Sequence, residues 1–137
     1  MLASIVVRTL NESEHLGDLL QMIDLQRTND IDVEVVVVDS GSTDGTVDIA
    51  QSFGARLTTI KKSEFSFGRS LNRGCAFSKG DILIFISGHC VPADENWPWV
   101  HFQGDARRVV AEDPRIDATL CVLEAAARLN LGDLKRE

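Results

Sequence analysis

The sequence has few cysteines, no basic run and no long apolar stretch. Its three cysteines, Cys75, Cys90 and Cys121, are odd in number and widely spaced, which argues against a disulfide framework and against a CxxC metal site. A reducing, cytoplasmic setting fits this cysteine content. No apolar stretch approaches the roughly 20 residues that span a bilayer, and MLASIVVRTL lacks the pattern of a secretory signal peptide. We therefore expect a cytoplasmic protein without a transmembrane segment.

Positive charge and the commonest nucleotide-binding signatures are also scarce. Lys and Arg number 14 against 21 Asp and Glu, which gives a formal net charge of −7. Nucleic acid is therefore an improbable main partner, because phosphate binding depends on a basic patch. The sequence contains no GxGxxG after its first apolar run and no GxxxxGK[ST], so the dinucleotide-binding and P-loop classes lose their main support.

What the sequence does contain is an alternation of strand and helix patterns over its first 87 residues. The near-continuous valine of VEVVVVD is typical of a strand buried on both faces, as in a parallel sheet. Connections of the observed length favour parallel strands joined by right-handed crossovers. We predict strands at 4–8, 33–39, 56–60 and 81–87, and helices near 11–23, 44–53 and 69–78. The predicted fold class is α/β, with a mostly parallel, Rossmann-like nucleotide-binding sheet and flanking helices.

The C-terminal part has a different pattern, and no strand is predicted after residue 87. Asp113-Pro114 is typical of a helix N-cap followed by proline in the first turn. Apolar residues then recur at helical spacing, at Ile116, Leu120, Leu123 and Ala127. We therefore predict a C-terminal helix over 116–131.

Polar segments follow the predicted strands, at 8–12, 39–46, 61–68 and 87–92. The carboxyl ends of parallel strands meet at one edge of a sheet, where ligands bind. There the carboxylate of Asp39 and the hydroxyl of Ser40 can bond a base or a ribose. A purely structural alternative stays open, in which glycines such as Gly41 serve a turn and Asn11 and Asp44 cap helices.

Three segments, in this order, resemble family 2 glycosyltransferases: SIVVRTLNE, VEVVVVDSGSTDGT and FGRSLNRGCAFSKGDILIFISGHCVP. The resemblance covers about residues 3–100. It implies the GT-A fold, in which a nucleotide-binding α/β half precedes an acceptor-binding half. It also implies transfer of a sugar from a nucleotide-sugar donor to a saccharide or lipid-linked acceptor, often in the synthesis of bacterial cell-surface polysaccharide. Residues 1–100 then form the donor-binding half of a truncated GT-A domain, and 101–137 a helical tail that does not match the family.

The resemblance also implies which residues bind the nucleotide. They are Arg8, Thr9, Asn11, Glu12, Asp39, Ser40, Gly41 and Arg69. The family usually ends its second strand with two acidic residues, whereas here Ser40 follows Asp39, which leaves the identity of the base open. Arg69, near the start of a predicted helix, is expected to hold a phosphate, unless it is an ordinary solvated arginine. Gly74, in the family's Asn-x-Gly, is expected to let a helix pack closely on the sheet.

The largest departure from the family is at its Asp-x-Asp motif, which Ser87-Gly88-His89 replaces. In the family this acidic pair holds a divalent metal that neutralises the leaving diphosphate. His89 falls where the main ligand would be, so a metal such as Mn²⁺ or Mg²⁺ is an expectation, with imidazole better suited to Mn²⁺. Two alternatives stay open: a cationic His89 that replaces part of the metal's charge, and a merely structural histidine.

The catalytic base cannot be assigned, because no motif in 101–137 matches the family's second half. A non-catalytic nucleotide or nucleotide-sugar binding module is therefore the alternative to an enzyme. A sheet that lacks this half would have an open edge or an uncovered face, which favours a homo-oligomer.

Overall fold

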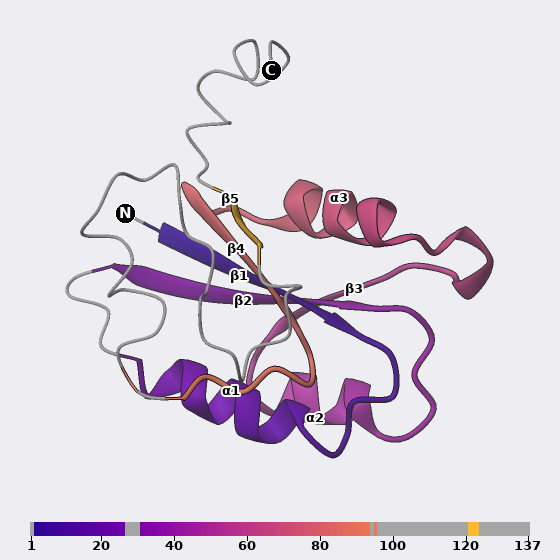
Figure 1. The fold of residues 1–137 in the computed structure, drawn as a ribbon, viewed down its shortest axis with the longest axis horizontal. Coiled ribbons are helices and arrows are strands. Elements are labelled where there is room, and N and C mark those ends of the chain that lie inside the picture. Colours follow the sequence, from indigo (N-terminus) through magenta and orange to yellow (C-terminus); the bar gives the residue numbers. More distant parts are fainter. Residues whose placement is uncertain (1, 27–30, 94, 96–120, 124–137) are drawn as a thin grey trace, which may run out of the picture.

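The computed structural model describes residues 2–26, 31–93, 95 and 121–123 (Figure 1). They form one sheet of order β3-β2-β1-β4-β5, in which the first four strands are parallel. The strands are β1 (Leu2–Thr9), β2 (Asp32–Asp39), β3 (Arg56–Thr59), β4 (Ile82–Ser87) and β5 (Cys121–Leu123). The helices are α1 (Leu16–Asp24), α2 (Thr46–Ser52) and α3 (Phe67–Phe77), with a 3₁₀ turn, η1, at Lys62–Glu64.

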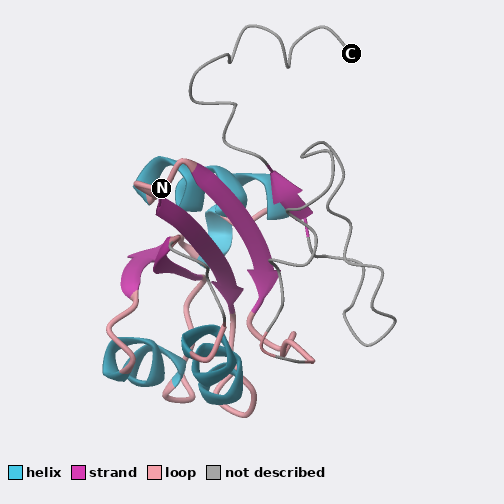
Figure 2. Cartoon of the chain, turned by 90° about the vertical axis from the view of Figure 1, so that its left-hand side faces the viewer, coloured by secondary structure: helices cyan, strands magenta, loops and turns pink. Residues whose placement is uncertain are grey.

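Helices cover both faces of this sheet, with α1 and α2 on one face and α3 on the other (Figures 1 and 2). The connections from β1 to β2 and from β2 to β3 step in one direction and carry α1 and α2. The connection from β3 to β4 returns past β1 and carries α3, which right-handed crossovers place on the opposite face. The three layers confirm the predicted α/β class with a mostly parallel sheet and flanking helices.

The core lies on both sides of the two central strands. Val6, Val36 and Val38 pack on the α3 side, whereas Val7 and Val37 pack against α1 and α2. All five side chains are fully buried, as the valine run predicts for a strand covered on both faces. Because side chains alternate along a strand, neighbours in sequence serve different halves of the core.

The same alternation divides the end of β1 between the two faces. Thr9 pairs in register with Asp39 of β2, and Arg8 pairs in register with Ser87 of β4. Arg8 follows Val6 with a spacing of two and therefore lies on the α3 side, whereas Thr9 lies on the side of α1 and α2. The polar residues at this edge thus form two groups on opposite faces of the sheet.

The predicted C-terminal helix is wrong at residues 121–123, which form β5 antiparallel to β4. Phe85 pairs with Cys121, and Leu83 pairs with Leu123. Without β5 the outer edge of β4 would leave backbone donors and acceptors unpaired, and strand pairing satisfies them. The helical spacing of apolar residues contains no information about this distant partner. The rest of the predicted helix lies outside the described residues.

The N-terminal cap of α1 also differs from the prediction, in which Asn11 filled this role. The helix begins at Leu16 with His15 as its N-cap residue, and the carbonyl of Glu12 accepts from the backbone N–H of Leu16 (2.8 Å). Asn11 has a φ of 54°, a left-handed conformation that asparagine tolerates better than most residues. Asn11 therefore belongs to the loop after β1 and not to the helix.

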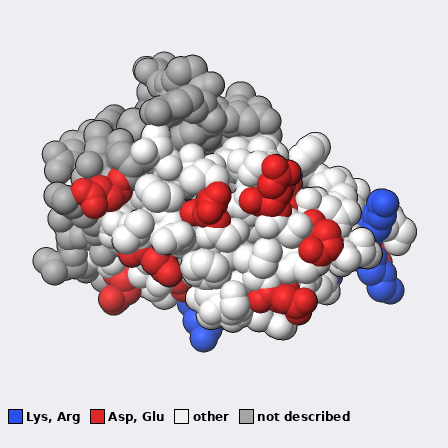
Figure 3. All heavy atoms as spheres, turned by 90° about the horizontal axis from the view of Figure 1, so that it is seen from below, with Lys and Arg blue, Asp and Glu red and all other residues white. Residues whose placement is uncertain are grey.

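The surface formed by α1 and α2 carries mainly acidic side chains (Figure 3). This face therefore offers no basic patch of the kind that binds nucleic acid. Among the described residues no helix combines the length and the apolar content needed to cross a membrane.

Candidate functional site

The carboxyl ends of β1 and β4 lie side by side at the point where the strand order reverses. From β1 the chain steps to β2 and β3 on one side, and it then returns to place β4 on the other side of β1. In open α/β sheets the crevice at such a switch point is where ligands bind. The residues that end these strands and the loops that follow them are therefore the candidate site.

Asp39 organises the loop on the side of α1 and α2. Its side chain is only 2% exposed. One carboxylate oxygen accepts from the hydroxyls of Thr9 (2.9 Å) and Ser42. The other accepts from the backbone N–H groups of Gly41 and Ser42, both at 2.9 Å. A carboxylate has about four acceptor positions, so donors from the protein occupy all of them.

These hydrogen bonds decide the ionisation of Asp39. Burial raises the pKa of the carboxyl group, but the hydrogen bonds from Ser42, Gly41 and Thr9 outweigh this effect and hold the pKa below its usual value. Asp39 is therefore a buried carboxylate that stays ionised near neutral pH and holds the turn in place. Gly41 has a φ of 103°, which favours glycine and supports the turn interpretation of this residue.

Ser40 is also engaged within the protein. Its side chain is 3% exposed, and both its backbone N–H and its hydroxyl donate to the carbonyl of Thr9, at 3.0 Å each. Direct contact of Asp39 or Ser40 with a nucleotide stays a prediction, whereas their contribution to the geometry of the loop is observed.

The loop after β1 is hydrogen-bonded to the loop after β2 at four points. These are Asn11 N to Ser42 Oγ (2.8 Å), Thr43 N to Asn11 Oδ1 (2.8 Å), Glu12 N to Thr46 Oγ1 (2.8 Å) and Ser13 N to Asp44 Oδ2 (3.1 Å). Asp44 also accepts from the backbone N–H of Thr46 (3.1 Å), the first residue of α2, although the N-cap residue of this helix is Gly45 and not Asp44 as predicted. Hydrogen bonds, first of all from the Thr46 hydroxyl, hold the pKa of Asp44 well below its usual value. The two loops therefore form one hydrogen-bonded unit.

Glu12 and His89 meet across the switch point. Glu12 Oε1 lies 3.2 Å from His89 Nδ1, and their side chains are 20% and 43% exposed. The turn after β4 can lie this close to β1 because residue 88 is glycine. A Cβ atom on Gly88 would lie only 2.9 Å from Cγ of Glu12 and 3.0 Å from Cγ2 of Thr9. The sequence singles out Glu12 and His89 separately, but nothing in it predicts that they pair.

Arg8 occupies the other face of the same edge. Its guanidinium donates to the hydroxyl of Ser87 (2.9 Å) and lies 4.5 Å from the centre of the Phe67 ring, a cation–π geometry. Phe67 is 63% exposed and packs edge-to-face against Phe65, with 5.7 Å between ring centres. Nothing in the sequence pattern singles out Phe65 or Phe67. The alternation of β1 and β4 is the signal that could have placed Arg8 and Ser87 beside α3.

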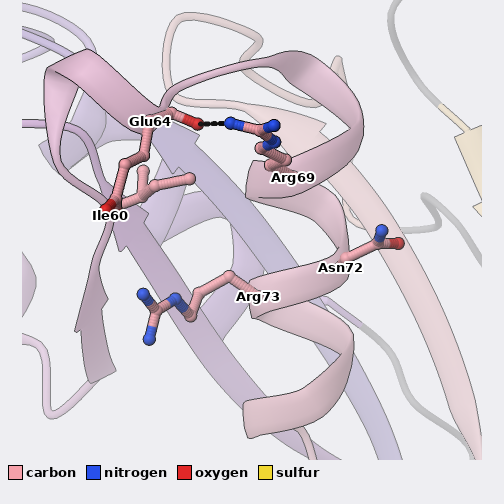
Figure 4. Close-up of a pocket in the computed structure, with 5 residues that line it drawn as sticks. All are labelled: Ile60, Glu64, Arg69, Asn72 and Arg73. Atoms are coloured by element: carbon pink, nitrogen blue, oxygen red, sulfur yellow. Dashed lines mark hydrogen bonds between the residues drawn. The ribbon is translucent and has the colours of Figure 1, made fainter.

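Arg69 lies apart from the Asp39 loop, on α3 beyond the end of β3. Ser66 caps this helix, because its hydroxyl accepts from the backbone N–H of Arg69 (3.2 Å). The guanidinium of Arg69 donates to the carbonyl of Glu64 (3.3 Å). An open pocket of about 490 Å³ is lined by Glu64 and Arg69 together with Ile60, Asn72 and Arg73 (Figure 4). Arg69 and Arg73 place two positive charges one helical turn apart on this pocket.

A parallel sheet whose strand order reverses, with helices on both faces, places the chain in the doubly wound, Rossmann-like α/β class. Within that class, residues 4–100 match the family model described as "Glycosyl transferase family 2". The match covers well over half of the chain, so the chain belongs to glycosyltransferase family 2, as the resemblance of its motifs predicts.

Relatives and solved structures agree with this family. The glycosyltransferase AglE of Haloferax volcanii is 32% identical over 94 residues, which are 65% of this chain and 31% of AglE. Glucosyl-3-phosphoglycerate synthase of Mycolicibacterium paratuberculosis is 31% identical over 104 residues, 71% of this chain and 31% of that protein. The chain therefore spans about a third of the length of the curated relatives that it matches.

Two similar structures contain a nucleotide and manganese. One is a mannosyltransferase of Pyrobaculum calidifontis in complex with GDP-Man and Mn²⁺, with a TM-score of 0.57 and 27% identity over 68% of this chain and 29% of that chain. The other is glucosyl-3-phosphoglycerate synthase of Mycobacterium tuberculosis in complex with Mn²⁺, UDP and glucosyl-3-phosphoglycerate, with a TM-score of 0.55 and 29% identity over 66% of this chain and 36% of that chain. The GT-A fold is thereby confirmed.

The residues described at the switch point do not fit the metal that these neighbours bind. No group of three or more His, Cys, Asp or Glu able to hold a metal occurs within the described part of the chain. Glu12 and His89 offer one carboxylate and one imidazole, and the hydroxyl of Ser87 already accepts from the guanidinium of Arg8. A permanent positive charge bonded to a would-be ligand opposes a divalent cation. These surroundings therefore argue against a metal-ligand role for His89.

Proposed function

We propose that this chain is the donor-binding half of a family 2 glycosyltransferase and binds a nucleotide sugar at the carboxyl ends of β1 and β4. The observation that carries the proposal is the reversal of strand order between β1 and β4, which lies inside the segment that matches the family. Together with an acceptor-binding half, such a domain transfers the sugar to an acceptor. The family implies single displacement with inversion at the sugar carbon.

Within this proposal the two faces of the edge have different tasks. The loop held by Asp39, with Thr9, Ser40, Gly41 and Asn11, forms a rigid frame for the nucleoside. On the α3 side, the guanidinium groups of Arg8 and Arg69 supply positive charge for phosphate oxygens. Glu12 and His89 lie 3.2 Å from each other where the loops after β1 and β4 meet.

A saccharide or lipid-linked acceptor in bacterial cell-surface polysaccharide synthesis is the proposed acceptor class. Mycobacterial relatives named "PGL/p-HBAD biosynthesis glycosyltransferase", 37% identical over 87 residues, support a biosynthetic transfer reaction. A structure of glucosyl-3-phosphoglycerate synthase in complex with phosphoglyceric acid supports a small phosphorylated acceptor instead. The cytoplasmic location and the division of the chain at residue 100 remain predictions.

The second candidate function is a non-catalytic nucleotide or nucleotide-sugar binding module. The replacement of the family's acidic pair by Ser87 and His89 favours it. Both candidates predict donor binding, and only the enzyme predicts turnover. Hydrolysis or transfer of a radiolabelled donor by the full chain, measured above a no-enzyme control, separates them.

Donor binding is tested by a thermal-shift screen of UDP-, dTDP- and GDP-sugars. At a concentration of 100 Kd, a ligand of the folded state stabilises by about 2.7 kcal/mol, so we expect at least one donor to raise the Tm. The matched control is the free nucleoside, which lacks the diphosphate and should raise the Tm less. Unchanged Tm values with all donors and their nucleoside diphosphates would refute the proposed function.

Self-association is a further part of the proposal. Helices cover both faces of the sheet, so the described residues do not show the uncovered face that would favour an oligomer. The remaining argument is the outer edge of β3, the last strand in the order on its side, because an unpaired strand edge invites pairing. We expect sedimentation equilibrium to detect a dimer, and a monomer across the concentration range would contradict this part.

A further inference from the structure

We infer that Arg8, held in place by Ser87 and Phe67, binds the diphosphate of the donor directly, so that this chain binds its nucleotide without a divalent metal. The inference rests on the proposed function, which it deepens by naming the group that balances the diphosphate's charge. It goes against the expectation that Mn²⁺ or Mg²⁺ performs this task.

Arg8 lies where the order of strands in the sheet reverses. It is the penultimate residue of β1 and pairs in register with Ser87, the last residue of β4. The backbone N–H of Gly88 donates to the carbonyl of Arg8 (2.9 Å) and continues this pairing beyond the strands. Arg8 therefore lies on the two strands between which the sheet order reverses, where a bound ligand is expected.

The charge at the end of β4 is less negative than in the family. The family's two carboxylates are replaced by a hydroxyl and an imidazole, and the hydroxyl is bonded to a guanidinium. Two negative charges that would attract a dication are absent, and one permanent positive charge is present. Compared with the family's acidic pair, these residues are less suited to a dication and better suited to an anion. Within the part of the chain that the structure describes, the carboxylate of Glu12 faces this region, and its Oε1 lies 3.2 Å from Nδ1 of His89.

The guanidinium of Arg8 is held in a defined orientation. Ser87 bonds one of its nitrogens, and the Phe67 ring lies 4.5 Å from its central carbon. Guanidinium groups bind phosphate oxygens through parallel N–H donors, in a bidentate geometry that lysine cannot reproduce. A group that is already oriented loses less entropy when the ligand binds. Ser87 and Phe67 are thus positioning residues for Arg8.

The sheet contains a second arginine that lies over a phenylalanine ring, and it provides a control. Arg56 of β3 lies 4.4 Å from the centre of the Phe77 ring and donates to Glu34 (2.9 Å). Residues 34 and 56 are at or near the amino ends of β2 and β3, at the edge opposite the candidate site. Arg56 therefore shares the cation–π contact of Arg8, with its charge paired to Glu34, in a place where no donor is expected to bind.

The experiment measures the affinity of the full chain for UDP and for GDP by calorimetry, in EDTA and in Mn²⁺. We expect the nucleotide that binds to have the same Kd within about twofold in both conditions. Arg8→Met should weaken its binding at least tenfold but leave the corresponding nucleoside, which has no phosphate, within about twofold. Arg8→Lys should restore only part of the loss, and Arg56→Met should bind like the wild type.

The outcomes separate the inference from the proposed function. Binding that requires Mn²⁺ and is abolished by EDTA would overturn the inference and leave the proposed function intact. Absence of nucleotide binding in both conditions would overturn both. If Arg8→Met does not fold, the Kd of the wild type in EDTA and in Mn²⁺ still shows whether nucleotide binding needs a metal. The double variant Ser87→Asp, His89→Asp restores the family's acidic pair and should make nucleotide binding dependent on Mn²⁺. If nucleotide binding by the wild type already depends on Mn²⁺, the inference is refuted.

Discussion

Replacing Asp39 by alanine is expected to lower the free energy of unfolding by about 3–4 kcal/mol, because it leaves several buried donors without an acceptor. The four lost hydrogen bonds come from two hydroxyls and two backbone N–H groups, those of Thr9, Gly41 and Ser42. The side chain is 2% exposed, so water cannot readily replace the carboxylate. Asp39→Asn keeps the volume but turns an amide NH₂ group toward donors, and we expect a loss of similar size.

Urea unfolding of the wild type and both variants measures this effect. The control is Asp32→Ala at the other end of the same strand, where the aspartate is exposed; its effect should stay within about 0.5 kcal/mol. Because donors from the protein already saturate the carboxylate, any loss of nucleotide binding in Asp39→Ala should accompany a loss of stability. A variant as stable as the wild type would contradict the role assigned to Asp39.

The contribution of Asp39 should also depend on pH in a defined direction. Its pKa is lowered in the folded protein, whereas an unfolded aspartate has a pKa of about 3.9. The stabilisation is therefore fully present above about pH 5 and is lost as the pH falls through the lower, folded pKa. The difference in unfolding free energy between the wild type and Asp39→Asn should be constant from about pH 5 to pH 8 and shrink in acid.

Elements with a strong local pattern could be predicted from the sequence. The run of valines in β2 predicts a strand buried on both faces. The helical spacing of apolar residues predicts the buried side of α1, which consists of Leu16, Leu19, Leu20 and Ile23. The clustering of polar loops at one edge also follows from the sequence, because parallel strands must end together. These predictions succeed because the information lies within a few neighbouring residues.

Predictions failed where the deciding partner is distant in sequence. β5 forms because β4 offers an open edge 36 to 40 residues earlier in the chain, and Asn11 bonds Thr43 across two loops. The saturation of Asp39 depends partly on a hydroxyl of β1 30 positions earlier. The contact of Arg8 with Phe67 needs both the sheet register and the start of α3. The chemistry of the site is therefore decided by register, which a single sequence reveals only indirectly.

Replacing Gly74 by alanine should destabilise the fold by about 2–4 kcal/mol, although alanine is the better helix former by about 1 kcal/mol. A Cβ atom on Gly74 would lie 2.3 Å from Cγ1 of Val6 and 3.2 Å from Cγ2 of Val38. Both valines are fully buried in the sheet, so either α3 must move outward or the valines must leave their preferred rotamers. This proximity confirms the close packing expected of Gly74 from the family's Asn-x-Gly.

Gly68→Ala in the same helix is the matched control, because a Cβ atom there meets no atom within 4 Å. It should leave stability unchanged or raise it slightly, and both variants can be compared by urea unfolding. Adding Val6→Ala to Gly74→Ala removes the clashing methyl groups, so the double variant should be more stable than the sum of the single effects predicts. Additive effects, or a Gly74→Ala protein as stable as the wild type, would show that α3 does not depend on this contact.

An outward shift of α3 would also carry Phe67 away from Arg8, so Gly74→Ala should weaken binding of the nucleoside diphosphate as well, whereas Gly68→Ala should not.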